Sequence, residues 1–476
     1  MNIDSIYKLA EDNSIETVDL KYTNLFGGLH HLTLPIDNLS SELFERGIGI
    51  DGSSVPGLKS SEVSSDAVII PDPLTVVIDP FWETRTLSML CGIYTAAERA
   101  PHPLDSRRIA FKAETFLAET GIANESLWAP EFEFFIFDSI RYLNDINTAC
   151  YQIDSTEANW KTHDSMLTPA LSPNPHNEGY HSAPPRDRFF NLRNNICSHL
   201  QSFGIKVKYH HHEAGGPAQS EIETFMEPLV RCGDNSTLIK YTCKMAARAA
   251  GKCVTFMPKP LFNEAGNGLH FHQRLVKEGQ PVFYDPDGYA GLSRTALYYI
   301  GGLLKHGPAL LALTNPSTNS YKRLGSGFEA PVRAIFGLGD RTAAVRIPEY
   351  ASRPDRKRIE FRPPDASCNI YIAMAAQLMA GLDGILNEID PSEQGFGPFD
   401  IDAGRTSTSD RNAVPKLPAS LEEAIRSLER DHDFLTAGGV FPHYFFENWI
   451  EGKLRKDNEA VIARPHPYEI QLYFDV

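Results

Sequence analysis

The stretch "PEFEFFIFD", residues 130–138, alternates glutamate and phenylalanine at the spacing of a β-strand. Successive side chains of a strand point to opposite faces, so Glu131 and Glu133 share one face, whereas Phe132 and Phe134 share the other. Two like charges beside apolar surface are costly unless one is protonated or a cation joins them. The pattern therefore indicates either a cation site or an amphipathic strand whose acids face water, and this stretch alone leaves both interpretations open.

Three other short segments repeat this alternation of ionisable and apolar residues. They are "SEIETF" (220–225), "GLHFHQRL" (268–275) and "RIEFRPPD" (358–365). Their paired polar residues are Glu221 and Glu223, His270 and His272, and Glu360 and Arg362. If each segment is a strand, each pair projects to one face, and the four strands together can direct them into a common concave surface. Four such pairs favour a site over a face turned to bulk water.

The residue types of these pairs favour a divalent metal bound by oxygen ligands. Glutamates with an imidazole, and without cysteine ligands, suit Mg²⁺ or Mn²⁺ better than a structural zinc ion. Glu131 and Glu133 can each turn to a different ion, which relieves their repulsion. Two metal ions that hold phosphate oxygens, together with arginines, are typical of phosphoryl transfer.

The segment 319–362 supplies the arginines that such chemistry needs. It contains Arg323, Arg333, Arg341, Arg346, Arg353, Arg356, Arg358 and Arg362. A solvated basic face is the alternative, but several of these arginines stand beside Gly, Ile, Pro or Phe, which favours a partly buried, anion-binding role for some of them. The chain has no P-loop motif and no dinucleotide-binding fingerprint after a strand. The run His210 to His212 alternates faces, so at most two of these rings can point the same way, and the pattern does not favour them as metal ligands.

Composition sets the class of protein. A chain of 476 residues predicts two or three domains with a substantial core. Asp and Glu outnumber Lys and Arg by 61 to 45, which makes nucleic acid or an anionic membrane an unsuitable main partner. No long uninterrupted apolar run and no secretory pattern at the N-terminus is found, and the seven cysteines are scattered, so we expect a cytoplasmic protein with reduced thiols.

The chain is expected to divide at residues 100–104, "APHPL", where two prolines resist helix continuation. We expect a small α+β domain over residues 1–102 and a larger α+β domain over 103–476. Two long stretches, 139–187 and 391–418, are predicted to be irregular, as lids, subunit contacts or disordered loops. An amphipathic helix is predicted after Ser420, which forms a capping-box pattern with Glu423.

Several long motifs resemble the type I bacterial glutamine synthetases. They include "GIDGSSVPG" (49–57), "NEGYHSAPPRD" (177–187), "HHHEAGGPAQSEIE" (210–223), "NPSTNSYKRLGSGFEAPV" (315–332) and the closing "PHPYEIQLYFDV" (465–476). The resemblance covers nearly the whole chain. It implies a β-grasp amino-terminal domain and a catalytic domain whose antiparallel strands form a funnel surrounded by helices. It also implies a dodecamer of two stacked hexameric rings with active sites shared between adjacent subunits.

The same resemblance assigns roles to individual residues. One metal site would comprise Glu133, Glu213 and Glu221, and a second would comprise Glu131, His270 and Glu360, each holding Mg²⁺ or Mn²⁺. The substrate L-glutamate would be held by Arg323, Arg362 and the backbone near Gly266. Arg341 and Arg346 would neutralise the transferred phosphoryl group, and Arg358 and His272 would contact ATP. The ammonium pocket would use Glu213, Tyr180 and Glu329 of one subunit with Asp51 and Ser54 of its neighbour. The activity implied is ligation of ammonia to glutamate through γ-glutamyl phosphate, with Asp51, Glu329 and Arg341 acting in catalysis.

Some positions depart from the family pattern. Ala265 replaces a usual Asn, Arg274 a usual Ser and Asp355 a frequent Lys, and the first lies near the expected glutamate site and the others near ATP. Residues 372–443 contain no tyrosine, so the adenylylation switch of many relatives is expected to be absent. A γ-glutamyl ligase that uses an organic amine, and a catalytically inactive scaffold, are the alternative functions. Retention of Asp51 to Ser54 argues against the first, and the intact set of metal ligands with Glu329 argues against the second.

Overall fold

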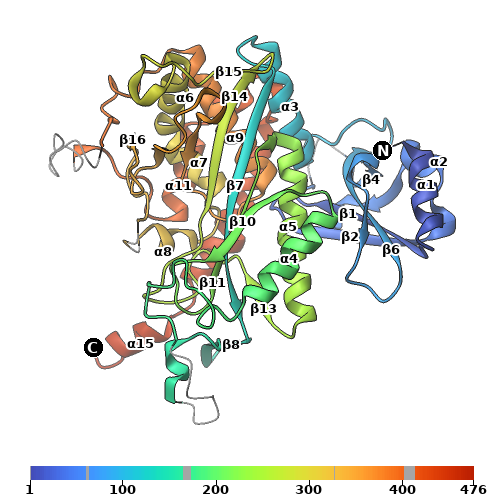
Figure 1. The fold of residues 1–476 in the computed structure, drawn as a ribbon, viewed down its shortest axis with the longest axis horizontal. Helices are drawn as coiled ribbons and strands as arrows, with labels where there is room; N and C mark the ends of the chain where they lie inside the picture. Colours follow the sequence, from blue (N-terminus) through green and yellow to red (C-terminus); the bar gives the residue numbers. More distant parts are fainter. Residues whose placement is uncertain (1, 60–63, 164–172, 326, 328, 401–412) are drawn as a thin grey trace.

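The chain builds a smaller β-sheet near its N-terminus and a larger one at its centre, each accompanied by helices (Figure 1). The computed structural model describes residues 2–59, 64–163, 173–325, 327, 329–400 and 413–476. The α+β class expected from the sequence is confirmed.

The smaller sheet has the strand order β2-β1-β6-β4-β3, with β5 also paired to β6. Its strands are β1 (Thr17–Thr23), β2 (Leu29–Pro35), β3 (Ile48–Asp51), β4 (Asp66–Pro71), β5 (Val77–Asp79) and β6 (Thr86–Thr95), and helices α1 (Ile3–Asp12) and α2 (Ser41–Arg46) accompany them. β1 and β6 run parallel, and the other pairs are antiparallel. Val18, Leu20 and Ile69 are fully buried, so the apolar positions of these strands form the core of this region.

The larger sheet has the order β10-β11-β7-β14-β18-β17-β16. Its strands are β7 (Glu125–Phe137), β10 (Val207–His212), β11 (Gln219–Thr224), β14 (Leu269–Lys277), β16 (Phe336–Leu338), β17 (Val345–Ile347) and β18 (Ile359–Phe361). Three short strands pair alongside it: β12 (Glu227–Pro228), β13 (Cys253–Thr255) and β15 (Gln280–Pro281). All neighbours along the main order are antiparallel except β16 and β17, which are parallel. The four polar segments singled out in the sequence lie on β11, β7, β14 and β18, which are neighbours in the sheet in this order.

Strand β7 runs through the middle of the larger sheet (Figure 1). The side chains of Phe132, Phe134 and Ile136 are fully buried, as the alternation of the sequence predicts. Helix α5 (Leu229–Ala249) packs against β7, and α9 (Ile370–Leu386) packs against α5 and α3 (Ser106–Glu119). The apolar face of β7 therefore anchors the strand in the core and leaves its glutamate face for the site.

The remaining helices surround the larger sheet. They are α4 (Phe190–Ser202), α6 (Arg294–Lys305), α7 (Gly307–Thr314), α8 (Ser320–Leu324), α11 (Leu421–Arg430), α12 (Asp433–Thr436), α13 (His443–Glu451), α14 (Ala460–Ile462) and α15 (Pro467–Tyr473). A π-helical segment, η8 (Gly452–Glu459), joins α13 to α14. In the part of the chain that the structure describes, no helix combines the length and apolar character needed to cross a bilayer.

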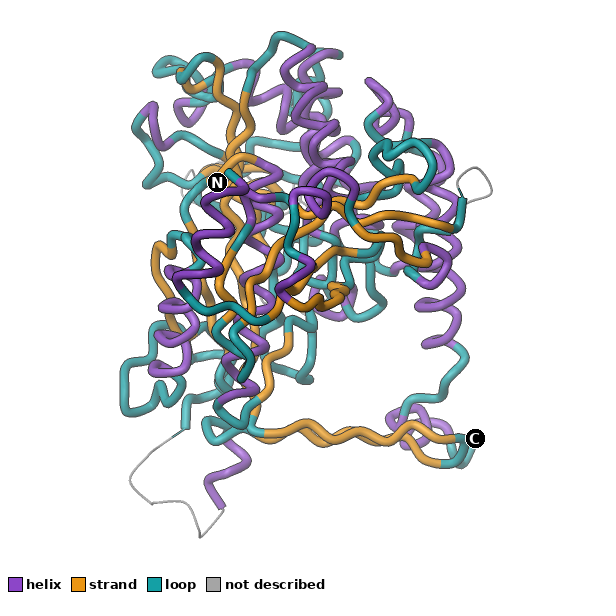
Figure 2. Tube along the Cα trace, turned by 90° about the vertical axis from the view of Figure 1, so that its right-hand side faces the viewer, coloured by secondary structure: helices purple, strands orange, loops and turns teal. Residues whose placement is uncertain are grey.

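The stretch 139–187 is not irregular throughout, so that prediction is wrong in its first part. Strands β8 (Ser139–Asp145) and β9 (Thr148–Asp154) form an antiparallel hairpin that extends from the body as a two-stranded arm (Figure 2). A 3₁₀ turn, η4 (Asn159–His163), follows. Residues 164–172 of this stretch, and residues 401–412 of the stretch 391–418, lie outside the described residues.

Candidate active site

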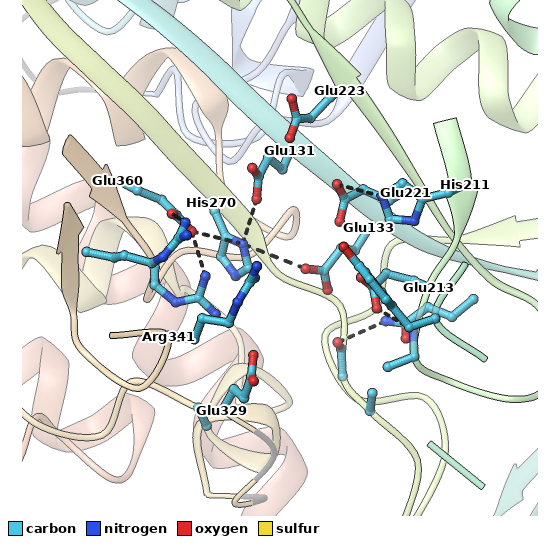
Figure 3. A pocket seen from close by; sticks show the side chains of 18 of the residues that line it. Glu131, Glu133, His211, Glu213, Glu221, Glu223, His270, Glu329, Arg341 and Glu360 are labelled. Atoms are coloured by element: carbon cyan, nitrogen blue, oxygen red, sulfur yellow. Dashed lines mark hydrogen bonds and ion pairs between the residues drawn. The ribbon is translucent and has the colours of Figure 1, made fainter. Parts of the chain in front are cut away.

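A pocket of about 450 Å³ lies on the glutamate face of β7. The sheet register brings the polar pairs together: Glu133 lies opposite Glu221, and Glu131 lies opposite both Glu223 and His270. On the other side of β14, Arg346 lies opposite Glu360. All the ionisable residues of the four pairs except His272 line this one pocket (Figure 3).

Glu131, His270 and Glu360 form one group that can hold a metal ion. Nδ1 of His270 lies 3.0 Å from Oε2 of Glu131 and 3.7 Å from Oε1 of Glu360. One ligand atom from each of the three residues lies within 4.8 Å of the others. This is the trio predicted for the second metal, and its oxygen and imidazole donors fit Mg²⁺ or Mn²⁺. Glu131 also groups with Glu223 and His272, whose ligand atoms meet the same distance limit.

A second group that can hold a metal ion consists of His211, Glu213 and Glu221. Nε2 of His211 lies 3.4 Å from Oε1 of Glu221. The sequence predicted Glu213 and Glu221 together with Glu133, and not His211. The carboxylate of Glu133 accepts a hydrogen bond of 2.7 Å from the backbone N–H of Gly268 and also lines the pocket.

Negative charge is in excess around Glu213 and Glu221. Burial raises the pKa of Glu213 to about 8, and the charges of Glu133 and Glu221 add to that rise. Burial raises the pKa of Glu221 well above its usual value as well, and Glu131 and Glu133 reinforce the shift. A divalent cation would offset this repulsion, so the residues present fit the metal that the donor set favours.

Around Glu131 and Glu360, neighbouring histidines and an arginine instead favour the ionised carboxylates. Burial alone would raise the pKa of Glu131, but the imidazoles of His272 and His270 outweigh it and hold that pKa well below the usual value. Burial also acts against the charge of Glu360, yet Arg362 and the two imidazoles lower its pKa to about 2. These two acids are therefore ionised and available as ligands at neutral pH.

Arginines close the pocket on the side of β17 and β18. Nη1 of Arg346 donates to Oε2 of Glu360, and Nη1 of Arg362 donates to Oε1 of the same carboxylate. The Nε atoms of Arg346 and Arg362 are buried and have no hydrogen-bond partner among the described residues. Arg341 is exposed and lines the same pocket as the glutamates (Figure 3). An anionic ligand would find these cationic groups already oriented.

Arg323 lines the pocket but uses most of its donors within the protein. Nη1 donates to the carbonyls of Pro363 and Pro364 at 2.7 and 3.1 Å, and Nη2 donates to the carbonyl of Arg362 at 3.2 Å. Nη2 also lies 3.2 Å from Nε2 of His270. This guanidinium therefore orders the end of β18 and the ring of His270.

The residues of this chain expected around ammonium, apart from Asp51 and Ser54, line the same pocket. Tyr180 and Glu329 both line the pocket with Glu213. Glu329 is exposed and has φ 47°, a left-handed backbone conformation that non-glycine residues adopt rarely. Its neighbours Ser326 and Phe328, part of the predicted loop, lie outside the described residues.

Four of the predicted site residues do not line this pocket: Asp51, Ser54, His272 and Arg358. His272 and Arg358 are connected to it through Glu131. Nε of Arg358 donates to Nδ1 of His272 at 3.2 Å, and Nε2 of His272 donates to Oε1 of Glu131 at 2.8 Å. Asp51 ends strand β3 of the smaller sheet, and Ser54 lies in the 3₁₀ turn η2 (Gly52–Ser54) that follows it. Both are exposed, and Oγ of Ser54 donates to Oδ2 of Asp51 at 2.6 Å.

Of the three positions expected to depart from the family pattern, Ala265 lines the pocket, whereas Arg274 and Asp355 do not. Ala265 lines the pocket next to Gly266, whose carbonyl accepts a 3.0 Å hydrogen bond from Nε2 of Gln219. Nη1 of Arg274 donates to the carbonyl of Asp355. Asp355 is held by an exposed ion pair with Arg353.

Sequence reasoning missed His211 and Tyr209, which both line the pocket. The signal was present, because residues 209, 211 and 213 share one face if the strand pattern of "KYHHHE" (208–213) continues to Glu213. Tyr209 donates through its hydroxyl to Glu223, and Lys208 donates to the same carboxylate. Glu223 was placed in a polar pair but received no role.

Comparison with known proteins agrees with this geometry. The family model described as "Glutamine synthetase, catalytic domain" matches residues 103–473, and the model described as "Glutamine synthetase, beta-Grasp domain" matches residues 14–96. Curated proteins named glutamine synthetase from Frankia alni and Aquifex aeolicus are 43% and 44% identical over 474 and 473 residues, with 99% of each chain covered.

Solved structures lead to the same family. The structure of Plasmodium falciparum glutamine synthetase aligns with a TM-score of 0.88 at 27% identity and covers 99% of both chains. The structure titled "Apo GmaS without ligand" aligns with a TM-score of 0.79 at 27% identity, covering 98% of this chain and 99% of the other. Because both family models and full-length relatives above 40% identity match, the chain belongs to the glutamine synthetase family.

Proposed function

We propose that this protein joins ammonia to the γ-carboxylate of L-glutamate with ATP, through γ-glutamyl phosphate, and releases L-glutamine, ADP and phosphate. The observation that carries the proposal is the pocket on β7, which combines two groups of metal-competent ligands with arginines in a chain of the glutamine synthetase family. A pocket of this composition suits phosphoryl transfer to a carboxylate.

The two metal positions would be held by residues already in place. We propose Glu131, His270 and Glu360 for one ion and Glu133, Glu213 and Glu221 for the other, with His211 as an additional donor to the second. Bound Mg²⁺ or Mn²⁺ would supply charge neutralisation for the phosphate oxygens of ATP.

A carboxylate is a poor electrophile, so the γ-carboxylate must first be phosphorylated. We propose that Arg341 and Arg346 stabilise the negative charge of the phosphoryl group as it moves. Arg362, with the backbone at Gly266, would hold the substrate glutamate, and Arg323 would support this site by fixing the end of β18. Arg358 and His272 would contact ATP from the edge of the pocket.

Ammonium must lose a proton before its nitrogen can attack. Glu213 and Tyr180 would bind the cation, and Glu329 at the pocket mouth would accept the proton. Asp51 and Ser54 are proposed to complete this site from a neighbouring subunit. Hydrogen bonds from Ser53 and Ser54 lower the pKa of Asp51, so its carboxylate is held ionised and oriented for a cation.

A homo-oligomer, specifically a dodecamer, is proposed because two exposed elements need a partner. The hairpin β8–β9 exposes Tyr142 and Ile146, and an isolated two-stranded hairpin is marginally stable in water. Helix α15 has no buried residue and exposes Tyr468, Ile470 and Leu472. We propose that further copies of this chain cover both.

We also propose a domain division and a cellular location for this protein. We propose that the chain divides into domains over residues 1–102 and 103–476, which the separate matches of the two family models support. A cytoplasmic location is proposed because the reaction consumes ATP and because all seven cysteines, which lie in the described residues, are unpaired.

The experiment that tests the function measures ADP release by the purified protein with Mg²⁺ and glutamate, comparing ammonium with a panel of organic amines. We expect ammonium to be the preferred nucleophile. Preference for an amine would replace the proposal with the γ-glutamyl amine ligase, and absence of ADP release with every nucleophile would favour an inactive scaffold.

A further inference from the structure

A histidine and a glutamate that the mechanism does not use form a buried pair behind the ammonium end of the pocket. Nε2 of His212 lies 2.9 Å from Oε2 of Glu157, and the two side chains are 0% and 1% exposed. Nδ2 of Asn174 lies 3.0 Å from the same nitrogen, and Oγ of Ser182 donates to Oδ1 of Asn174 at 2.6 Å. An ionisable pair this deeply buried is costly to maintain unless it has a use.

The ring of His212 is hydrogen-bonded to the backbone carbonyl of Glu213, which is the proposed metal and ammonium ligand. Nδ1 of His212 lies 2.6 Å from the carbonyl oxygen of Glu213, which can only accept, so this nitrogen carries a proton and donates. The opposite nitrogen shares a proton with Glu157, whichever of the two groups carries it. The ring is therefore fixed at both ends, and with it the peptide plane that follows Glu213.

The same ring also places the turn that carries Tyr180. The backbone N–H of His181 donates to the carbonyl of His212 at 2.9 Å, and the N–H of Gly179 donates to the carbonyl of Ala214 at 3.0 Å. A Cβ on Gly179 would meet Cε1 of His212 at 2.5 Å, so the turn rests on the imidazole itself. Tyr180 and Glu213, which both line the pocket, are thus set relative to one another by contacts with His212.

We propose that the His212–Glu157 pair is a positioning device for the ammonium end of the pocket, acting through the peptide of Glu213 and the turn Gly179–His181. Neither side chain lines the pocket, so both act through other residues. The inference rests on the proposed function, because it assigns a purpose to the relative placement of Glu213 and Tyr180. It also links the segment after β9, which supplies Glu157, to the end of β10, which supplies His212.

The test compares Glu157→Ala with Glu157→Gln. In the glutamine variant, the amide can donate to Nε2 of His212 and its oxygen can still accept from the N–H of Arg188, so the ring stays fixed. We expect Glu157→Ala to raise the KM for ammonium about tenfold, with little change in the KM for glutamate and ATP, and Glu157→Gln to restore it. In calorimetric titration of the metal-free protein with Mn²⁺, Glu157→Ala should weaken one of the two sites and leave the other unchanged.

The control is a histidine–carboxylate pair outside the pocket, in which the imidazole is buried and the carboxylate is partly exposed. Nδ1 of His306 lies 2.9 Å from Oδ2 of Asp431. Asp431→Ala should lower the melting temperature without changing the KM for ammonium or Mn²⁺ binding. If Glu157→Ala behaves like this control, the pair is merely structural and the inference is wrong. An equal rise in all three KM values, or a Glu157→Gln variant as impaired as Glu157→Ala, would also overturn it.

A second variant and a metal titration cover the cases in which Glu157→Ala does not fold or the protein shows no turnover. If Glu157→Ala does not fold, Ser182→Ala removes the more peripheral donor to Asn174 and should raise the KM for ammonium about threefold; an unchanged KM would overturn the inference. If the unmodified protein shows no ammonia-dependent turnover, the proposed function fails, and Mn²⁺ titration of the same variants then decides the positioning role. Selective weakening of one site supports that role, and unchanged binding contradicts it.

Discussion

Glu221 experiences the repulsion of several neighbouring carboxylates within the pocket, and this governs what its substitution does. Its charge is opposed by burial and by Glu131, Glu133 and Glu223. Glu221→Gln should therefore leave the unfolding temperature of the metal-free protein at pH 8 equal to or higher than that of the unmodified protein. The stabilisation that Mn²⁺ bound at the Glu221 position gives the unmodified protein, about 3 kcal/mol at a concentration of about 100 times Kd for that one site, should be lost in the variant.

Calorimetric scans in EDTA and in Mn²⁺ measure both effects. Glu125→Gln is the control, because Glu125 starts β7, the strand paired with β11, but does not line the pocket, and it should keep the gain from Mn²⁺. A metal-free Glu221→Gln protein that unfolds at a clearly lower temperature would contradict the account of repulsion.

Glu329 is expected to act on ammonium and not on the metals. It lines the pocket apart from the glutamates of the sheet, and it belongs to none of the groups of described residues that can hold a metal ion (Figure 3). Glu329→Ala should lower ammonia-dependent turnover by about 10²- to 10⁴-fold, the usual contribution of a general base, while Mn²⁺ titration stays as in the unmodified protein. Unchanged turnover would remove Glu329 from the mechanism.

Much of the pocket could be predicted from single residues because the strand period fixes which side chains share a face. Glu131, Glu133, Glu221 and His270 follow from that period alone. The sequence could not show that Arg323 spends its donors on the backbone of residues 362–364, because that depends on how α8 meets β18. It also could not show that Glu133 is tied to Gly268, because that bond joins residues far apart in the chain.

At the scale of elements, His306 ties three helices together. It follows α6, and its ring lies 2.8 Å from Oδ2 of Asp383 on α9 and 2.9 Å from Oδ2 of Asp431 at the end of α11. Burial alone would lower the pKa of His306, but Asp383 and Asp431 outweigh it and raise that pKa above its usual value.

A histidine whose pKa is higher in the folded than in the unfolded protein stabilises the folded protein at low pH. Its contribution is fully present below the unfolded pKa of about 6.5 and is lost as the pH rises through the folded pKa. His306→Gln should therefore lower the melting temperature more at pH 6 than at pH 9. The exposed His443, substituted by Gln, provides the control and should show no such difference. A deficit of His306→Gln that grows toward pH 9 would contradict the prediction.

The hairpin β8–β9 shows where pattern reasoning at this scale failed. Ile140 and Tyr142 on β8, and Tyr151 and Ile153 on β9, alternate with polar residues at the period of a strand. The signal was present, but it is short, and most residues of the hairpin are exposed in the structure. The helix α11 was predicted better. Oγ of Ser420 accepts from the N–H of Glu423 as the capping pattern requires, although Glu423 accepts from the N–H of Ala419 and not from Ser420.

At the scale of the whole molecule, the exposed hairpin predicts assembly through like chains. Tyr142 and Ile146 are among its exposed apolar residues. Replacing both by serine should reduce the mass measured by light scattering from that of the proposed dodecamer to smaller species, because apolar surface that would be buried between copies is lost. Tyr350→Ser, at an exposed tyrosine remote from the hairpin in sequence, should not change the mass. An unchanged mass for the double variant would exclude the hairpin from the interface.

The fold class followed from the sequence, because long motifs and strand patterns extend over the whole chain. The proposed completion of the ammonium site by Asp51 and Ser54 would require another subunit, which the sequence of one chain cannot position. The exposure of both residues at the end of β3 and in the turn after it is compatible with that role.

The central claim is that ATP activates the γ-carboxylate of glutamate before ammonia attacks. Phosphorylation forms a bond between a γ-carboxylate oxygen and the terminal phosphorus of ATP, with ADP leaving. Ammonia then forms the C–N bond, and the C–O bond to the phosphoryl group breaks. With both γ-carboxylate oxygens of glutamate labelled with ¹⁸O, mass spectrometry should find one labelled oxygen in each phosphate released and one in the amide of glutamine. Phosphate without the label, released together with glutamine, would contradict the account.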